Sequence, residues 1–159
     1  MQRAWWSLLL IFGMPKFTAL VYDTDDVVAL ERTMNCLSLA SDILVLLNGS
    51  HQLEKVAHRH GARTRNRIPG VTLGAYATEG FYPWTLVMHA GDELTPESLL
   101  ALHDWRKVKE DNAEIYRLQN SSSHPLVLVN RARVNWIGKD PPIPKDAPTL
   151  LPQDKQRAA

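Results

Sequence analysis

Apolar, strand-like runs alternate with helix-like patterns along the first half of the chain, and this alternation constrains the fold more than any other feature. The apolar runs cover residues 17–22, 43–47 and 84–88, and they hold the β-branched and aromatic residues typical of buried parallel strands. After the first run, apolar residues recur at helical spacing: Val27, Leu30, Met34 and Leu37. The alternation predicts an α/β domain with a mostly parallel sheet flanked by helices.

The character of the chain changes after residue 112. Residues 114–118 and 126–130 have the pattern of strands joined by a polar turn, and a further strand is expected at 134–137. Together they predict a small antiparallel patch. Beyond Gly138 the chain is rich in proline and charge and has no apolar periodicity. We therefore expect residues 139–159 to be an extended or disordered tail.

The first 16 residues stand apart from this pattern. They carry an arginine followed by an apolar run that is shorter than the roughly twenty residues of a membrane span. The run has the length of a signal-peptide core, but no Ala-x-Ala-like cleavage site follows it, and a strand pattern begins at Phe17. We interpret residues 1–16 as an N-terminal extension, either a loosely docked segment or the product of an upstream start, with Met14 as the natural one.

Composition narrows the class of protein. The 159 residues carry a formal net charge of +1, which gives no general attraction to nucleic acid, so no nucleic-acid partner is expected. A local basic segment at 63–67 holds three arginines, which either contact phosphate or are simply solvated. The single cysteine, Cys36, excludes an intramolecular disulfide and a multi-cysteine zinc site. We expect a cytoplasmic protein, with peripheral membrane association left open.

Polar residues stand at the ends of three expected strands: Asp23, Asn48 and His89. Right-handed crossovers bring such strand ends to one edge of a parallel sheet, which is the usual side for ligands. Just beyond His89, the carboxylates of Asp92 and Glu93 precede the start of a helix. This acidic pair is either a binding site for a metal ion and phosphate or a solvated turn.

Four segments carry a resemblance to a known family. They read LVYDTDD at 20–26 with LERTMNCLS at 30–38, ASDILVLLNGS at 40–50 with EKVA at 54–57, WTLVMHAGDELTPES at 84–98, and LVLVNRARVNWIG at 126–138. In order and spacing they resemble family-2 glycosyltransferases of the GT-A fold, and most of all the bacterial branch related to lipopolysaccharide-core enzymes. The resemblance implies a GT-A-like (Rossmann-like) domain over residues 17–138, a nucleotide-sugar donor and an acceptor that the sequence does not identify.

The resemblance also implies roles for particular positions. In the family, the turn after the first strand touches the nucleotide base, which here points to Asp23, Asp25 and Asp26. An aspartate after the second strand usually helps to hold the nucleotide, and this sequence has Asn48 in that region.

The family's Asp-x-Asp motif, which binds a divalent cation, is altered here. The corresponding letters are His89-Ala90-Gly91, and carboxylates follow only at Asp92 and Glu93. A diphosphate leaving group needs its developing charge neutralised, and Mg²⁺ or Mn²⁺ supplies this in the family. The resemblance therefore nominates His89 and Asp92 as metal ligands. Glu93 is the candidate for the carboxylate that deprotonates an acceptor hydroxyl.

Two functions from different classes remain open at the level of sequence. The first is a small glycosyltransferase of the hexosyltransferase type, which moves a sugar from a nucleotide-sugar donor. The second is a catalytically degenerate GT-A domain that binds a nucleotide or sugar, or serves as an interaction module. A generic nucleotide-binding α/β protein is less favoured, because the chain lacks a glycine-rich phosphate loop.

Overall fold

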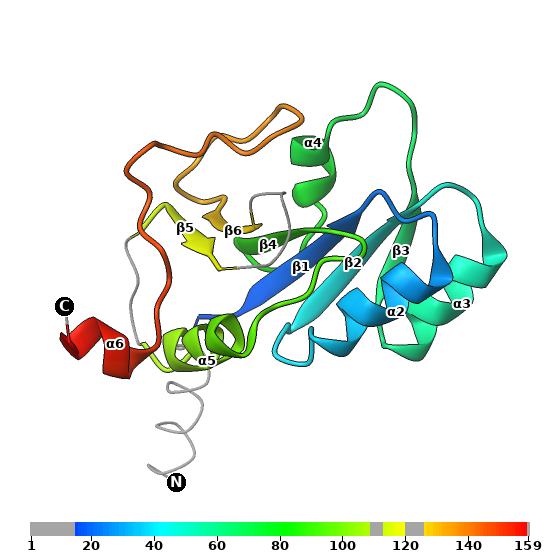
Figure 1. Cartoon of the computed structure of the whole chain (residues 1–159). Helices are drawn as coiled ribbons and strands as arrows, with labels where there is room; N and C mark the ends of the chain where they lie inside the picture. Colours follow the sequence, from blue (N-terminus) through cyan, green and yellow to red (C-terminus); the bar gives the residue numbers. More distant parts are fainter. Residues whose placement is uncertain (1–14, 109–112, 120–125, 159) are drawn as a thin grey trace, which may run out of the picture.

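The computed structural model describes residues 15–108, 113–119 and 126–158, which form a mixed six-stranded sheet and five helices (Figure 1). The strands are β1 (Phe17–Tyr22), β2 (Asp42–Leu47), β3 (Arg63–Asn66), β4 (Trp84–His89), β5 (Ile115–Leu118) and β6 (Leu126–Asn130). The helices are α2 (Val27–Asn35), α3 (His51–Arg59), α4 (Leu73–Ala77), α5 (Pro96–Trp105) and α6 (Gln153–Ala158). The predicted α/β class is confirmed.

The order of strands in the sheet is β3-β2-β1-β4-β6-β5. β1 lies between β2 and β4 and runs parallel to both, and β3 runs parallel to β2. β6 is antiparallel to β4 and to β5. The sheet is therefore mostly parallel with an antiparallel patch near its C-terminal side, which is the arrangement that the sequence predicts.

Helices and loops cover the two faces of the sheet, because alternate side chains of a buried strand point to opposite faces. On one face, Ala19 and Val21 of β1 pack in a cluster with apolar residues of α2, α3 and α5. On the other face, Leu20 packs in a second cluster with α4 and with Trp136 from the segment after β6. Figure 1 shows these layers: α2, α3 and α5 lie below the sheet, whereas α4 lies above it.

The order of the strands creates a topological switch point. The chain places β2 and β3 on one side of β1 and then crosses to place β4 on the other side. The strand order therefore reverses between β1 and β4, and ligands of open α/β sheets bind outside the carboxyl ends of the strands at such a point.

The segment after β6 differs from the prediction. Residues 134–137 form no strand, because the chain turns directly after β6, where the backbone N–H groups of Arg133 and Val134 both donate to Asn130 O at 3.0 Å. The turn sends Trp136 into the second cluster, where its side chain is buried. Here the tertiary packing of one large aromatic side chain overrides a short β-like pattern.

The tail from residue 139 packs against the domain. The tail was expected to be extended or disordered over residues 139–159; it has no regular helix or strand over residues 139–148, but it forms α6 at Gln153–Ala158. Thr149 forms a parallel bridge with Arg117 of β5, the Leu150 N–H donates to Arg117 O at 2.7 Å, and the Leu150 side chain is buried. Of the expected N-terminal extension, residues 1–14 lie outside the described part of the chain. None of the helices within the described ranges combines the length and apolar character needed to cross a bilayer.

Candidate functional site

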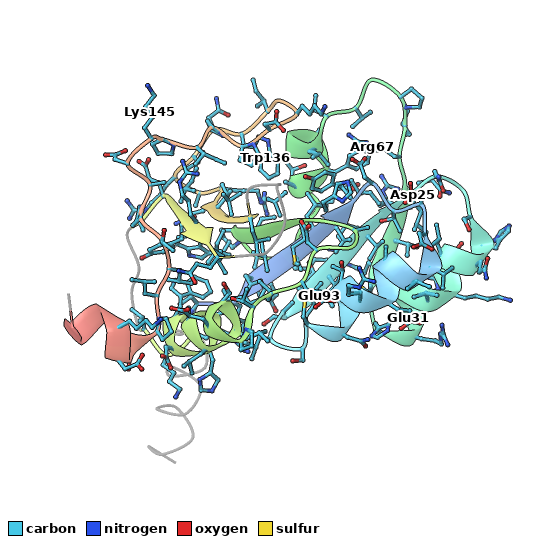
Figure 2. The ribbon with its side chains drawn as sticks, in the orientation of Figure 1. Asp25, Glu31, Arg67, Glu93, Trp136 and Lys145 are labelled. Atoms are coloured by element: carbon cyan, nitrogen blue, oxygen red, sulfur yellow. The ribbon has the colours of Figure 1, made fainter. Side chains whose placement is uncertain are left out.

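A cleft of about 340 Å³ opens at the carboxyl edge of the parallel strands. Its lining comes from the turn after β1, the end of β2 and the residues that follow it, the first residue after β3, and the end of β4. The lining residues are Asp23, Thr24, Asp25, Leu46, Leu47, Asn48, Arg67 and His89. Figure 2 labels Asp25 and Arg67 near each other at this edge. The position matches the ligand crevice expected at the switch point of an open α/β sheet.

Asp23 is at the centre of the polar contacts in the cleft. Its backbone has φ +53°, a left-handed conformation that an aspartate tolerates better than most residues, and it turns the chain sharply away from β1. One carboxylate oxygen, Oδ1, accepts a hydrogen bond from Arg67 Nη1 at 3.2 Å. The other, Oδ2, lies 3.4 Å from His89 Nε2. Residues at the carboxyl ends of three different strands thus meet at one carboxylate.

The orientation of the His89 ring follows from its neighbours. Nδ1 lies 2.9 Å from the carbonyl oxygen of Ala90, and because a carbonyl oxygen only accepts, Nδ1 is the nitrogen that donates. Nε2 therefore faces Asp23 and the cleft. The ring also packs edge-on against Tyr22, with centroids 5.3 Å apart and an interplanar angle of 86°. Packing and hydrogen bonding together hold the imidazole toward the cleft.

Thr24 contributes a hydrogen-bonding group with no partner among the described residues. Only 4% of the residue is exposed, and its hydroxyl oxygen is buried. A buried hydroxyl without a partner is destabilising unless water or a ligand completes it. Since Thr24 lines the cleft, water or a polar ligand group in the cleft can supply this partner.

A second compartment of about 370 Å³ adjoins the first and shares Asp23, Arg67 and His89 with it. Its remaining lining residues are Tyr22, Leu73, Lys139 and Asp140. Burial raises the pKa of the Tyr22 hydroxyl above its ordinary value, and the carboxylates of Asp23, Asp92 and Asp140 raise it further. The hydroxyl therefore remains a neutral hydrogen-bonding group near neutral pH.

Most of the nucleotide-binding positions nominated from the sequence come together in the cleft: Asp23, Asp25 and Asn48. Asp26 has a different task. Its carboxylate caps α2 by accepting hydrogen bonds from the N–H groups of Val28 at 3.3 Å and Ala29 at 3.2 Å. A capping carboxylate at the positive end of a helix dipole is a structural role, and Asp26 is not among the residues that line the cleft.

Asp92 lies in the turn after β4. Its residue is 6% exposed, and its Oδ2 accepts a hydrogen bond from the backbone N–H of His89 at 3.2 Å. The turn around it is fixed to α2, because Thr33 Oγ1 accepts from Gly91 N and donates to Asp92 O, each at 2.8 Å. The Leu94 N–H lies 3.4 Å from Cys36 Sγ, and burial raises the pKa of that thiol.

Glu93 is not among the residues that line either compartment. Its carboxylate forms an ion pair with Arg32 Nε of α2 at 3.1 Å, and both side chains are about half exposed. In Figure 2 Glu93 lies beside α2, well below the labels of Asp25 and Arg67. The residues that precede helix α5 therefore point toward α2, on the other side of the turn from the cleft.

A divalent cation fits this set of side chains poorly. Magnesium and manganese prefer several oxygen ligands around one point. The carboxylate of Asp92 is occupied in its turn, and that of Asp23 is shared between Arg67 and His89. No group of three or more His, Cys, Asp or Glu side chains in the described part of the chain is arranged to hold a metal ion. His89 and Asp92 remain a predicted pair of ligands, and one oxygen of the Asp92 carboxylate already accepts the His89 N–H.

Sequence reasoning did not nominate Thr24, Lys139 or Asp140. Thr24 lies between acidic residues that are the more obvious candidates. Lys139 and Asp140 belong to a segment without apolar periodicity, and such a segment does not indicate its position in the fold. Arg67 belonged to a basic segment with two open interpretations, and the structure separates its members. Arg63 and Arg65 form ion pairs with Asp42 and Glu79, whereas Arg67 lines the cleft.

The fold and the cleft define an α/β protein with an open cleft at the switch point of its sheet, lined by several polar and charged side chains. Comparison of the chain with protein-family models gives no match, and a search of curated proteins also gives none.

Proposed function

We propose that the cleft binds the nucleoside diphosphate part of a nucleotide-sugar and that the protein is a small glycosyltransferase of the GT-A type. One observation carries the proposal: carboxylate, amide and hydroxyl groups meet a guanidinium and an imidazole in a single cleft at the switch point. Its volume is within the range of small-molecule sites. The resemblance of four segments to family-2 glycosyltransferases supports the same ligand class.

The two kinds of polar group suit the two ends of such a ligand. Carboxylate and amide groups after the first strands accept hydrogen bonds from ribose hydroxyls and base N–H groups, which suits Asp25 and Asn48. A guanidinium recognises phosphate through parallel hydrogen bonds, which suits Arg67. The buried Thr24 hydroxyl gains the partner that it lacks.

Sugar transfer requires a carboxylate beside the acceptor. Asp140 in the adjoining compartment is better placed for this step than Glu93, which pairs with Arg32. In the proposed reaction Asp140 takes the proton of an acceptor hydroxyl, whose oxygen bonds to the anomeric carbon of the donor sugar. The bond between that carbon and the phosphate oxygen breaks, and its electron pair leaves with the nucleoside diphosphate.

The alternative is a domain that binds the nucleotide-sugar without transferring the sugar. The occupied carboxylate of Asp92 favours this alternative, because the family's metal position has lost a free acid. Asn48 favours it as well, since it stands where the family usually has an aspartate.

Calorimetric titration with UDP and with GDP tests the binding. We expect one of the two nucleotides to bind and to raise the melting temperature, as any ligand specific for the folded state does. Asp25→Ala should weaken binding about tenfold, since a lost hydrogen bond from a charged group costs about 1.5–3 kcal/mol. Asp154→Ala is the matched control, because Asp154 is an exposed acid on α6. If neither nucleotide binds under any condition, the proposed function is wrong.

Product release separates transfer from binding alone. The protein is incubated with UDP-glucose or GDP-mannose, and released UDP or GDP is measured by chromatography. Sugar transfer is supported if the wild type releases the nucleoside diphosphate and Asp140→Asn releases it at least about tenfold more slowly while still binding the nucleotide. The reason is that a general base typically contributes 10²–10⁴-fold to the rate. Binding without release supports the non-catalytic alternative.

A further inference from the structure

We infer that basic side chains of this chain, led by the charged Arg67 and Lys139 with His89 as a hydrogen-bonding partner, bind the diphosphate in place of a divalent cation. The inference rests on the proposed function, because it concerns how the same cleft holds its ligand. It departs from the metal dependence that the resemblance implies.

Arg67 is fixed where a diphosphate would lie. Its backbone N–H donates to Leu47 O at 2.7 Å, which ties the residue after β3 to the end of β2. Its Nη1 donates to Asp23, while Nε and Nη2 have no hydrogen-bond partner among the residues that the structure describes. About a third of the side chain, 32%, is exposed. The guanidinium thus keeps donors available for a bidentate contact with phosphate.

The positions of the charged groups follow the order of groups in a nucleotide-sugar. Arg67 and His89 line both compartments, so they lie where the two compartments join. Asp25 lines only the first compartment, and Lys139 lines only the second. In the ligand, the diphosphate joins the nucleoside to the sugar. A nucleoside in the first compartment and a sugar in the second therefore place the diphosphate at Arg67 and His89.

Lys139 adds a second positive charge on the sugar side. No ion pair joins its ammonium group to any acid in the described ranges, although Asp140 follows it in the chain. Lysine is a compact point charge that serves well as a phosphate contact. Arg67 and Lys139 are the arginine and the lysine among the lining residues, and each brings a positive charge to the diphosphate beside the carboxylates of Asp23, Asp25 and Asp140.

Asp23 explains why the same place suits cations of the protein better than a metal. Its carboxylate is held between Arg67 and His89, and a dication bound to Asp23 would lie beside the positive guanidinium. Asp92, the acid that the sequence offered as the second ligand, is turned into its own loop. The carboxylates of Asp25 and Asp140 line different compartments, and no three acidic, histidine or cysteine side chains of the described residues surround one point as a hard cation requires.

The test compares UDP and GDP binding by calorimetry in EDTA with binding in Mn²⁺ or Mg²⁺, and compares each nucleotide with its nucleoside. We expect the affinity in EDTA to stay within about twofold of that with metal. Arg67→Gln should weaken UDP or GDP binding at least about tenfold while leaving uridine or guanosine binding nearly unchanged. Arg65→Gln is the matched control, since Arg65 lies two residues away and pairs with Glu79 outside the cleft.

Lys139→Gln provides a second variant in case Arg67→Gln does not fold, because Lys139 is exposed and has no ion pair in the described part of the chain. It should weaken nucleoside diphosphate binding by about threefold to tenfold. Nucleotide binding that disappears in EDTA and returns with Mn²⁺ overturns this inference and leaves the proposed function standing. Equal weakening of nucleoside and nucleotide by Arg67→Gln also overturns it. Failure of every nucleotide to bind overturns both.

Discussion

Asp42 and Asp23 each pair with an arginine, but they lie at opposite ends of the sheet and in opposite environments. Asp42 begins β2, and its side chain is 3% exposed. It accepts hydrogen bonds from Arg63, from Thr18 Oγ1 at 2.9 Å and from the Phe81 N–H at 2.9 Å. The Asp23 side chain is 53% exposed at the cleft. The buried pair joins three strands and a loop, whereas the exposed pair remains available to a ligand.

Asp42→Asn tests the structural role of the buried pair. We expect the free energy of unfolding to fall by roughly 2–4 kcal/mol at pH 7, because Arg63 and its neighbours lose a buried charged acceptor. Urea denaturation measures the change. Asp104→Asn offers a comparison, since its carboxylate accepts an exposed hydrogen bond from Gln153 N, lies 3.6 Å from His103 Nδ1 and pairs with no arginine in the described part of the chain. Equal stability of Asp42→Asn and the wild type would show that the network is dispensable.

The same residue predicts a pH dependence. Burial by itself would raise the pKa of Asp42, but hydrogen bonds from Arg63, the Phe81 N–H and Thr18 outweigh it and hold the pKa below its ordinary value. A carboxylate whose pKa is lower in the folded state than in the unfolded chain stabilises the protein at pH values above its unfolded pKa, which is about 3.9 for aspartate. This stability is lost as the pH falls through the folded pKa. The difference between wild type and Asp42→Asn should therefore be largest near pH 7 and shrink below about pH 4. A difference that stays constant with pH would contradict this.

At the scale of elements, the short loop between β1 and α2 divides its acids between two tasks. Asp23 leaves β1 in a left-handed conformation, and Asp26 caps α2. Asp25 is exposed and lines the cleft. The division follows from the direction of the backbone, because the N-cap residue turns its carboxylate onto the helix and away from the ligand.

Asp26→Ala and Asp25→Ala should therefore have opposite effects. Loss of the cap in Asp26→Ala should lower the free energy of unfolding by about 1 kcal/mol and leave nucleotide affinity almost unchanged. Asp25→Ala should leave stability within about 0.5 kcal/mol and weaken binding. Urea denaturation and calorimetry on both variants check the pair. A strong loss of affinity in Asp26→Ala would return Asp26 to the binding site.

At the scale of the whole molecule, the segment after β6 completes both the core and the cleft. It buries Trp136 on the face of the sheet that α4 covers, and it brings Lys139 and Asp140 to the second compartment. Gly74 of α4 allows this close approach. A Cβ at Gly74 would lie 2.6 Å from Trp136 O and 2.9 Å from the backbone of Ile137. The Gly74 N–H donates to Gly138 O at 3.0 Å.

Gly74→Ala should move this segment away from α4. We expect a loss of about 1–3 kcal/mol in the free energy of unfolding, the usual cost of overpacking, although alanine favours a helix. Gly138→Ala is the control, because its added Cβ would meet nothing within 4 Å. Urea denaturation should separate the two variants clearly. Equal stability of the two variants would show that residues 136–137 do not pack tightly against α4.

The sequence determined the local elements of this protein. Apolar runs and helical spacing are properties of neighbouring residues, so β1, β2, β4 and β6, as well as the helices between them, could be predicted before the structure. The position of the cleft at the carboxyl edge of the sheet could also be predicted, because crossovers in a parallel sheet are right-handed. Asp23, Asn48 and His89 were placed at that edge for the same reason, whereas Asp25 was nominated by the family resemblance.

Only the tertiary structure decided what each side chain does there. Arg67 reaches Asp23 across 44 residues, and Thr33 ties down the loop of Asp92 across 59. Such contacts depend on how separate elements pack, which no local pattern records. Asp92 and Glu93, the acidic pair after β4, thus belong to a turn fixed to α2, while Arg67 and the segment after β6 complete the lining of the cleft. Local spacing sets which residues can reach an edge of the sheet, and packing between distant residues sets which of them line the cleft.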